Sequence, residues 1–196
     1  MNKAIKLGLV SLVLSCNSQL INAATPGAYL GGGVGLGRLA PESGLNKTKD
    51  SVLGGRLFFG YNFNEYMGME ANYSALGKTH YYDYNYPLVT GDYSLKALSL
   101  VGKIYLPFAK DSPANLYFLL GAAQLWGNFD VAYRSFSLAN FSTDAIVPTA
   151  GVGLSYDINQ HLKAGVELSA FGEKESEDHL GIPQSMLATF NLAYKF

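Results

Sequence analysis

Large apolar residues alternate with small or polar residues in short segments along this chain, most cleanly at its end. Phe190, Leu192, Tyr194 and Phe196 occupy every second position, and the residues between them are small or polar. A period of two places these four side chains on one face of a β-strand. An aromatic strand tip fits poorly in water, where chain ends fray, but it suits a membrane interface. The pattern predicts a closing strand that faces lipid.

Eight segments carry this alternation. They cover residues 29–36, 53–63, 66–74, 95–106, 116–126, 149–158, 162–170 and 187–196. The segment 116–126 is apolar at both parities as far as Gln124, so its facing is ambiguous. The pattern predicts eight strands and an all-β fold.

The connections between these segments alternate in length. The shorter connections are 64–65, 107–115 and 159–161, and the longer, polar ones lie near 37–52, 75–94, 127–148 and 171–186. Short turns at one end and long loops at the other are typical of outer-membrane barrels. In lipid every backbone polar group must be paired, which requires a closed sheet without edges. We therefore predict an eight-stranded antiparallel up-and-down transmembrane β-barrel.

The opposite parity of the strands carries charged residues that should point into the barrel. These residues are Arg56, Glu70, Lys103, Lys163, Glu167 and Lys195. An eight-stranded barrel is just wide enough to be filled by side chains, and buried charges must pair to offset their desolvation. We predict a lumen charge network that plugs the barrel, with ion pairs among Arg56, Glu70, Lys103 and Glu167.

Composition agrees with a barrel. Charged residues make up 15% of the chain, below the ~25% of a typical soluble domain, while there are 22 Gly, 14 Tyr and 11 Phe. The formal net charge of −1 gives no electrostatic reason to expect nucleic-acid binding. Beyond the N-terminal region no apolar run is long enough for a transmembrane helix.

The N-terminus has the features of an export signal. Lys3 and Lys6 precede the apolar run 7–14, and residues 21–23 form a small-residue cleavage site. We therefore expect a signal peptide at 1–23, a barrel domain at 24–196 and a location in the outer membrane. Residues 13–16 also loosely resemble a lipoprotein box, in which Cys16 would be lipidated rather than removed. If Cys16 is removed, the mature chain has no cysteine and no disulfide.

Two segments carry a family resemblance. Residues 59–73 and 151–158 resemble hairpin strands of the OmpA-like eight-stranded barrels of Gram-negative outer membranes. The resemblance implies that Glu70 and Lys103 occupy positions where the family carries inward-facing charges. It also implies that the terminal strand, with Phe196 last, is read as an assembly signal by the barrel assembly machinery. No residues follow Phe196, so a periplasmic domain is not expected.

Candidate catalytic residues are few. Ser176, Glu177 and His179 are the right residue types for nucleophilic hydrolysis, but they are adjacent in an acidic loop without a rigid scaffold. This acidic loop also lacks the spaced ligands of a calcium site. His161 falls in a predicted periplasmic turn, and His80 precedes tyrosines that suit either surface recognition or an extended hairpin. We expect no catalytic site, metal or cofactor.

The sequence thus favours a non-enzymatic outer-membrane barrel with a structural or surface-interaction role. Its expected partners are outer-membrane lipid and lipopolysaccharide, the barrel assembly machinery and host or surface ligands of the outer loops. The alternatives are an adhesin or host-factor-binding barrel, a lipid A-modifying enzyme, and a channel for small hydrophobic molecules.

Overall fold

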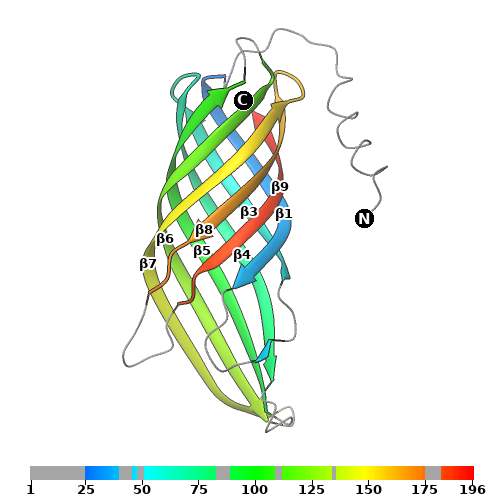
Figure 1. Ribbon diagram of the computed structural model, residues 1–196, viewed down its shortest axis with the longest axis vertical. Coiled ribbons are helices and arrows are strands. Elements are labelled where there is room, and N and C mark those ends of the chain that lie inside the picture. Colours follow the sequence, from blue (N-terminus) through cyan, green and yellow to red (C-terminus); the bar gives the residue numbers. More distant parts are fainter. Residues whose placement is uncertain are drawn as a thin grey trace, which may run out of the picture.

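The computed structural model describes residues 25–39, 46–47, 51–82, 89–108, 112–133, 136–174 and 182–196, and most of them lie in strands (Figure 1). The strands are β1 (Gly27–Leu39), β2 (Asn46–Lys47), β3 (Val52–Asn62), β4 (Met67–Tyr82), β5 (Val89–Pro107), β6 (Ala114–Tyr133), β7 (Phe136–Asp157), β8 (Leu162–Phe171) and β9 (Ser185–Lys195). Among the described residues no helix has the length and apolar character needed to cross a bilayer.

Eight strands close into a barrel, as the sequence predicts. From β3 to β9 each strand pairs antiparallel with the next in the chain. β1 pairs with β3 on one side and with β9 on the other, where the register runs from Tyr29↔Lys195 to Leu39↔Ser185. The two-residue strand β2 stands outside this ring and pairs with β4. The closed ring leaves the membrane-spanning part without an edge strand.

The alternation of the sequence becomes an inside and an outside of the wall. On β3, Arg56 and Phe58 are buried, whereas Leu57 and Phe59 are 66% and 54% exposed. The remaining barrel strands carry large apolar side chains on their outer face in the same way. The facing of β6 was ambiguous in the sequence, and in the structure Leu119 and its odd-numbered neighbours face inward. An exposed apolar band around the wall is the surface that lipid covers.

Short turns connect the strands at the end where β1 begins and β9 finishes. In the turn after β3, the Asn64 side-chain oxygen accepts the backbone N–H groups of Tyr66 and Met67, each at 2.8 Å. Asn159 does the same for His161 and Leu162 after β7. Asparagine stabilises tight turns in this way. By the length rule for outer-membrane barrels, this end faces the periplasm.

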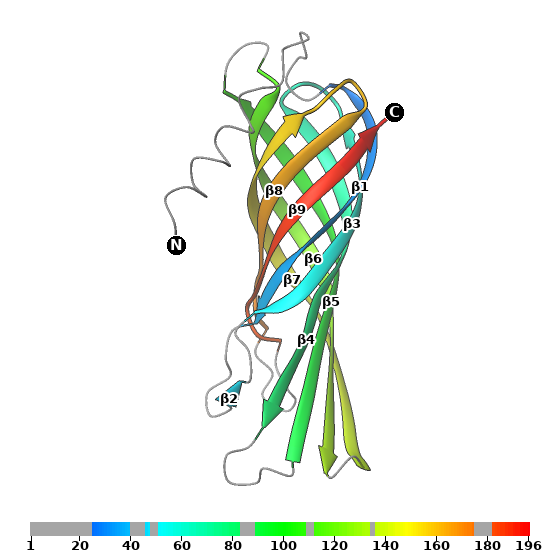
Figure 2. The same ribbon diagram turned by 90° about the vertical axis from the view of Figure 1, so that its right-hand side faces the viewer.

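At the opposite end the strands differ greatly in length. β4 to β7 continue well past the closed ring as a four-stranded sheet, while β1, β3, β8 and β9 stop (Figure 2). We call residues 78–82, 89–94, 128–133 and 136–144 the outer extension. β7 is 22 residues long but pairs with β8 only from Thr149 to Asp157.

The outer extension corrects the prediction of long polar loops at 75–94 and 127–148. Most of these residues are strand, and only two residues separate β6 from β7. Cross-strand pairing continues through these polar residues and satisfies the backbone, so polarity did not end the strands. The predicted loops near 37–52 and 171–186 do separate strands, and their described residues include β2 and a Lys174–Ile182 bridge.

A β-bulge marks the base of the outer extension on β4. The register against β5 shifts between Ala75 and Lys78, and Gly77 has a φ of +93°. This backbone conformation favours glycine. A Cβ at Gly77 would also lie 2.6 Å from the Leu53 carbonyl oxygen. The bulge reverses the inward parity of β4, because Leu76 is buried before it and Thr79 after it.

Candidate functional site

Charged side chains from four strands meet inside the barrel. Arg56 comes from β3, Glu70 from β4, Lys103 from β5 and Glu167 from β8, and all are buried. Arg56 forms ion pairs with Glu70, at 2.5 Å, and with Glu167. Lys103 Nζ lies 2.8 Å from Glu70 Oε2. Two cations and two carboxylates therefore balance in this group, which we call the central network.

Hydroxyl groups complete the hydrogen bonding of the two carboxylates. Tyr29 donates to Glu70 Oε2 at 2.8 Å, and Tyr117 donates to Glu167 Oε2 at 2.9 Å. Ser169 donates to Glu167 Oε1 at 2.6 Å. Buried charges tolerate a low-dielectric interior only when they are paired and hydrogen-bonded in this way. With their oxygens engaged, neither carboxylate is placed to act as a general base.

Aromatic rings surround the Lys103 ammonium. Its Nζ lies 4.2 Å from the centre of the Tyr117 ring, 5.5 Å from that of Tyr29 and 5.6 Å from that of Tyr105. These distances allow cation–π attraction, which strengthens when the cation is desolvated. The rings also fill volume, so they stabilise the charge and block the lumen at the same level.

A second charged group lies nearer the periplasmic end. Asp157, at the end of β7, is 3.1 Å from Lys195 Nζ and 3.8 Å from Lys163 Nζ. Lys163 is thus closest to Asp157 rather than to a glutamate of the central network. Two lysines share one carboxylate here, so this group has one positive charge without a paired negative charge.

The sequence-based prediction did not include four residues that these groups use: Tyr29, Tyr117, Asp157 and Ser169. Asp157 follows the inward parity of residues 151–157, so the alternation alone was sufficient to include it. Tyr29 opens the segment 29–36 on the parity opposite to Leu30, so the alternation was sufficient to include it as well. Tyr117 lies in the segment whose facing was ambiguous, and no sequence pattern distinguished it from a tyrosine that faces lipid.

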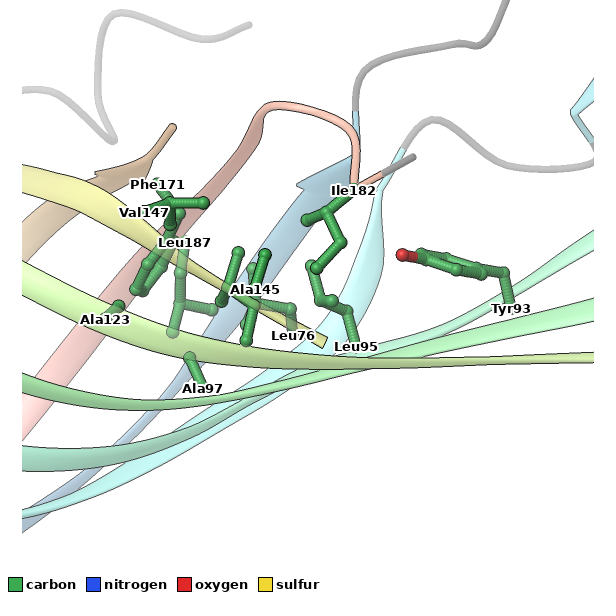
Figure 3. Close-up of a cluster of buried hydrophobic side chains, with 11 residues drawn as sticks. Leu76, Tyr93, Leu95, Ala97, Ala123, Ala145, Val147, Phe171, Ile182 and Leu187 are labelled. Atoms are coloured by element: carbon green, nitrogen blue, oxygen red, sulfur yellow. The ribbon is translucent and has the colours of Figure 1, made fainter. Parts of the chain in front are cut away.

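The outer half of the lumen is apolar. Figure 3 shows side chains from several strands and from the β8–β9 connection packed together there. This apolar plug consists of Leu76, Tyr93, Leu95, Ala97, Ala123, Leu125, Ala145, Val147, Phe171, Ile182 and Leu187. Ile182 is held by backbone hydrogen bonds with Lys174, at 3.0 Å in both directions. The lumen is therefore filled at two levels, by ion pairs and by packed apolar side chains.

The outer extension presents charged side chains to water. Lys78 Nζ lies 2.8 Å from Asp92 Oδ2, and the hydrogen bond to Asp92 raises the pKa of Lys78 above its ordinary value. Closer to the membrane, Gln124 donates a hydrogen bond to Asp144 at 2.9 Å. These exposed contacts suit a surface in water, where single ion pairs contribute little stability.

The terminal strand exposes the four residues of the predicted assembly signal. Phe190, Leu192, Tyr194 and Phe196 are 57%, 47%, 50% and 74% exposed on the outer face of the barrel. The Tyr194 ring stacks on His161 with centroids 5.5 Å apart and contacts the Phe196 ring edge-on at 5.4 Å. Their part in assembly stays a prediction.

The histidines provide no assembled catalytic group among the described residues. His161 lies in the β7–β8 turn, and its Nδ1 is 3.1 Å from the Lys195 carbonyl oxygen. The predicted grouping of Ser176, Glu177 and His179 lies outside the described residues, as do Tyr84, Tyr86 and the segment 1–24 that includes Cys16. Within the described ranges no three potential metal ligands cluster.

Comparison with known proteins agrees with this geometry. The model of the "Outer membrane protein beta-barrel domain" family matches residues 7–196. Outer membrane protein A of Yersinia pseudotuberculosis is 25% identical over 177 residues, which cover 86% of this chain and 48% of that protein. Outer membrane protein A of Serratia marcescens is 23% identical, covering 78% of this chain and 42% of that protein. The chain thus spans about half the length of these curated relatives.

Solved structures show the same fold. Ail, the attachment invasion locus protein of Yersinia pestis, superposes with a TM-score of 0.57 at 18% identity, covering 88% of this chain and all of that one. OprG from Pseudomonas aeruginosa gives a TM-score of 0.54 at 16% identity, covering 90% of this chain and 99% of that chain. Ail has also been crystallised with the heparin analogue sucrose octasulfate.

Proposed function

The chain belongs to the outer membrane protein β-barrel family, and from this premise we propose that it is a non-enzymatic scaffold that presents a binding surface outside the cell. The observation that carries the proposal is the outer extension of β4 to β7, which rises beyond a closed and filled barrel. The barrel anchors the protein in the outer membrane, and the outer extension is the part that a surface ligand reaches.

The filled lumen supports a scaffold in preference to a pore. The central network and the apolar plug occupy successive levels of the same interior. Opening a path would separate buried ion pairs, at a cost of several kcal/mol for each charge left alone. It would also displace packed apolar side chains. A barrel built for diffusion would keep a polar, water-filled interior instead.

The non-enzymatic part of the proposal rests on the interior carboxylates. Glu70 and Glu167 already accept hydrogen bonds from cations and hydroxyl groups. A general base must reach a substrate proton, which these engaged and buried groups do not. A lipid A-modifying enzyme would instead need its catalytic groups near the outer rim.

The charges of the outer extension and its base favour a protein ligand over a polyanion. Among the described residues of the outer extension and its base, the basic ones are Lys78 and Lys96 and the acidic ones are Asp92, Asp130 and Asp144, with Lys78 paired to Asp92. The β8–β9 connection adds the acidic run 173–178. A sulfated polysaccharide, the ligand type represented in the Ail complex, would be repelled by such a surface.

Trimming the outer extension tests the proposal. Residues 80–92 and 129–141 are each replaced by Asn-Gly, which joins the paired positions Thr79↔Tyr93 and Asn128↔Ser142 by tight turns and keeps Tyr93 in the apolar plug. The control variant replaces residues 175–181 with a Gly-Ser linker of equal length. Heat-modifiable mobility on gels checks that each variant is folded.

Cells expressing each variant are then tested for attachment to surfaces coated with purified extracellular-matrix proteins. We expect the trimmed barrel to fold but to lose attachment, while the control keeps it. Attachment by the trimmed variant, or no attachment by the wild type, would refute the binding role. Steady conductance of the wild type in planar bilayers would refute the closed scaffold, and an altered lipid A mass spectrum in a deletion strain would refute the non-enzymatic assignment.

A further inference from the structure

A small cavity lies within the charged part of the lumen. Its volume is about 30 Å³, and its wall includes Arg56, Lys103 and Lys163 together with Glu70 and Glu167. A cavity of this size has room for roughly two water-sized spheres. A monatomic ion therefore fits.

Three buried polar atoms on the cavity wall lack a hydrogen-bond partner among the described residues. They are Arg56 Nε, Ser155 Oγ and Asn191 Oδ1. The Arg56 side chain is only 3% exposed, and its other two nitrogens already bind the carboxylates of the central network. An orphaned buried donor is costly, and the usual explanation is a bound water or ion.

The charges around the cavity do not balance. Its wall carries three cations, Arg56, Lys103 and Lys163, against the two carboxylates Glu70 and Glu167. Adding Asp157 and Lys195 leaves the excess unchanged, at four cations to three carboxylates in the described lumen. An uncompensated charge in this interior costs several kcal/mol, which a counter-ion removes.

From these observations we infer that the cavity binds a single halide-sized anion, with chloride as the physiological species. The Arg56 Nε–H and the Ser155 hydroxyl donate to it, and Lys163 contributes the balancing charge. The two glutamates do not exclude the anion, because their oxygens are held by Arg56, Lys103 and hydroxyl groups. Asn191 Oδ1 accepts a hydrogen bond from a water that accompanies the anion.

Lys163 and Lys195 also mark the route of entry. They lie at the periplasmic end of the lumen, with side chains 11% and 6% exposed, and they share Asp157. An anion that enters from the periplasm therefore passes two cations before it reaches Arg56.

Bromide crystallography tests the site directly. Crystals of the full chain grown in sodium bromide are measured at the bromine absorption edge. We expect one anomalous peak in the cavity, within contact distance of Arg56 Nε. A cavity that holds only water density without an anomalous peak would overturn the inference.

Thermal unfolding provides the second readout. The gel-mobility midpoint is measured in sodium chloride and in sodium gluconate at equal ionic strength, since gluconate is too large for the cavity. When the chloride concentration is tenfold above its dissociation constant, chloride binding should raise the unfolding midpoint temperature by roughly 3–6 °C. Ser155→Val fills the cavity and should abolish this difference, whereas Ser185→Val, at a buried position on β9 six residues from Asn191 and outside the cavity wall, should keep it.

If the chloride effect is absent in the wild type, or identical in both variants, the inference fails. A bromide peak without halide-dependent stability would mean an adventitious ion only, and would also overturn it. Should Ser155→Val not fold, the wild-type comparison and the bromide crystals remain decisive.

Discussion

Removing the charge of Glu70 should destabilise the barrel strongly. Glu70 is fully buried, lies 2.5 Å from Arg56 and 2.8 Å from Lys103, and accepts a hydrogen bond from Tyr29. Glu70→Gln keeps the shape but leaves Lys103 without a counter-charge, while Arg56 retains Glu167. Removing one partner of a buried ion pair lowers the unfolding free energy by about 3–5 kcal/mol. We expect a loss of unfolding free energy in that range.

The assay is urea unfolding in lipid vesicles, followed by the fluorescence of Trp126, the only tryptophan. Glu70→Gln combined with Lys103→Met removes both partners, and replacing a whole buried pair by neutral groups is often close to neutral. The double variant should therefore recover most of the loss. Glu173→Gln, at an exposed position, serves as the matched control and should stay within about 0.5 kcal/mol of the wild type. A loss below about 1 kcal/mol for Glu70→Gln, or no recovery in the double variant, would refute the reasoning.

Three further outcomes are expected. Leu125→Ala in the apolar plug should cost about 2–5 kcal/mol in the same urea assay, whereas Leu120→Ala, 73% exposed to lipid, should cost clearly less; equal losses would contradict a packed plug. Phe196→Asp should reduce insertion into the outer membrane, read as heat-modifiable protein in membrane fractions, and wild-type levels would contradict the assembly role. N-terminal sequencing of the mature protein should begin at Ala24, and a lipid-blocked Cys16 would overturn the proposed cleavage.

Strand number, order and, except in β6, facing could be predicted because lipid imposes a strict alternation on each membrane-spanning segment. Arg56, Glu70, Lys103 and Glu167 lie on the parity that this rule assigns to the interior. The pairing among them could not be read from the sequence, because it depends on the stagger between strands. Asp157 shows this well, since it lies beside Lys163 only through the β7–β8 register.

Part of the apolar plug was beyond sequence reasoning for a different reason. Ala123 and Leu125 face inward, yet apolar residues also line the outer face of the same strand. When both parities are apolar, alternation carries no information about facing. The strand ends in water were missed because polar residues fit either a loop or a solvated sheet, and only the cross-strand hydrogen bonds distinguish the two.

β7 has different strand partners along its length, so its backbone amides should be protected from hydrogen exchange to two different degrees. From Thr149 to Asp157 its amides lie between β6 and β8, whereas from Phe136 to Pro148 the described strand partner is β6 alone. Local opening of a strand paired on one side costs less than opening of a strand in a closed ring. Deuterium uptake should therefore change sharply near Thr149, within an unbroken strand rather than at its end. The membrane-embedded half then acts as a rigid anchor, and the half in water is free to fray and re-form.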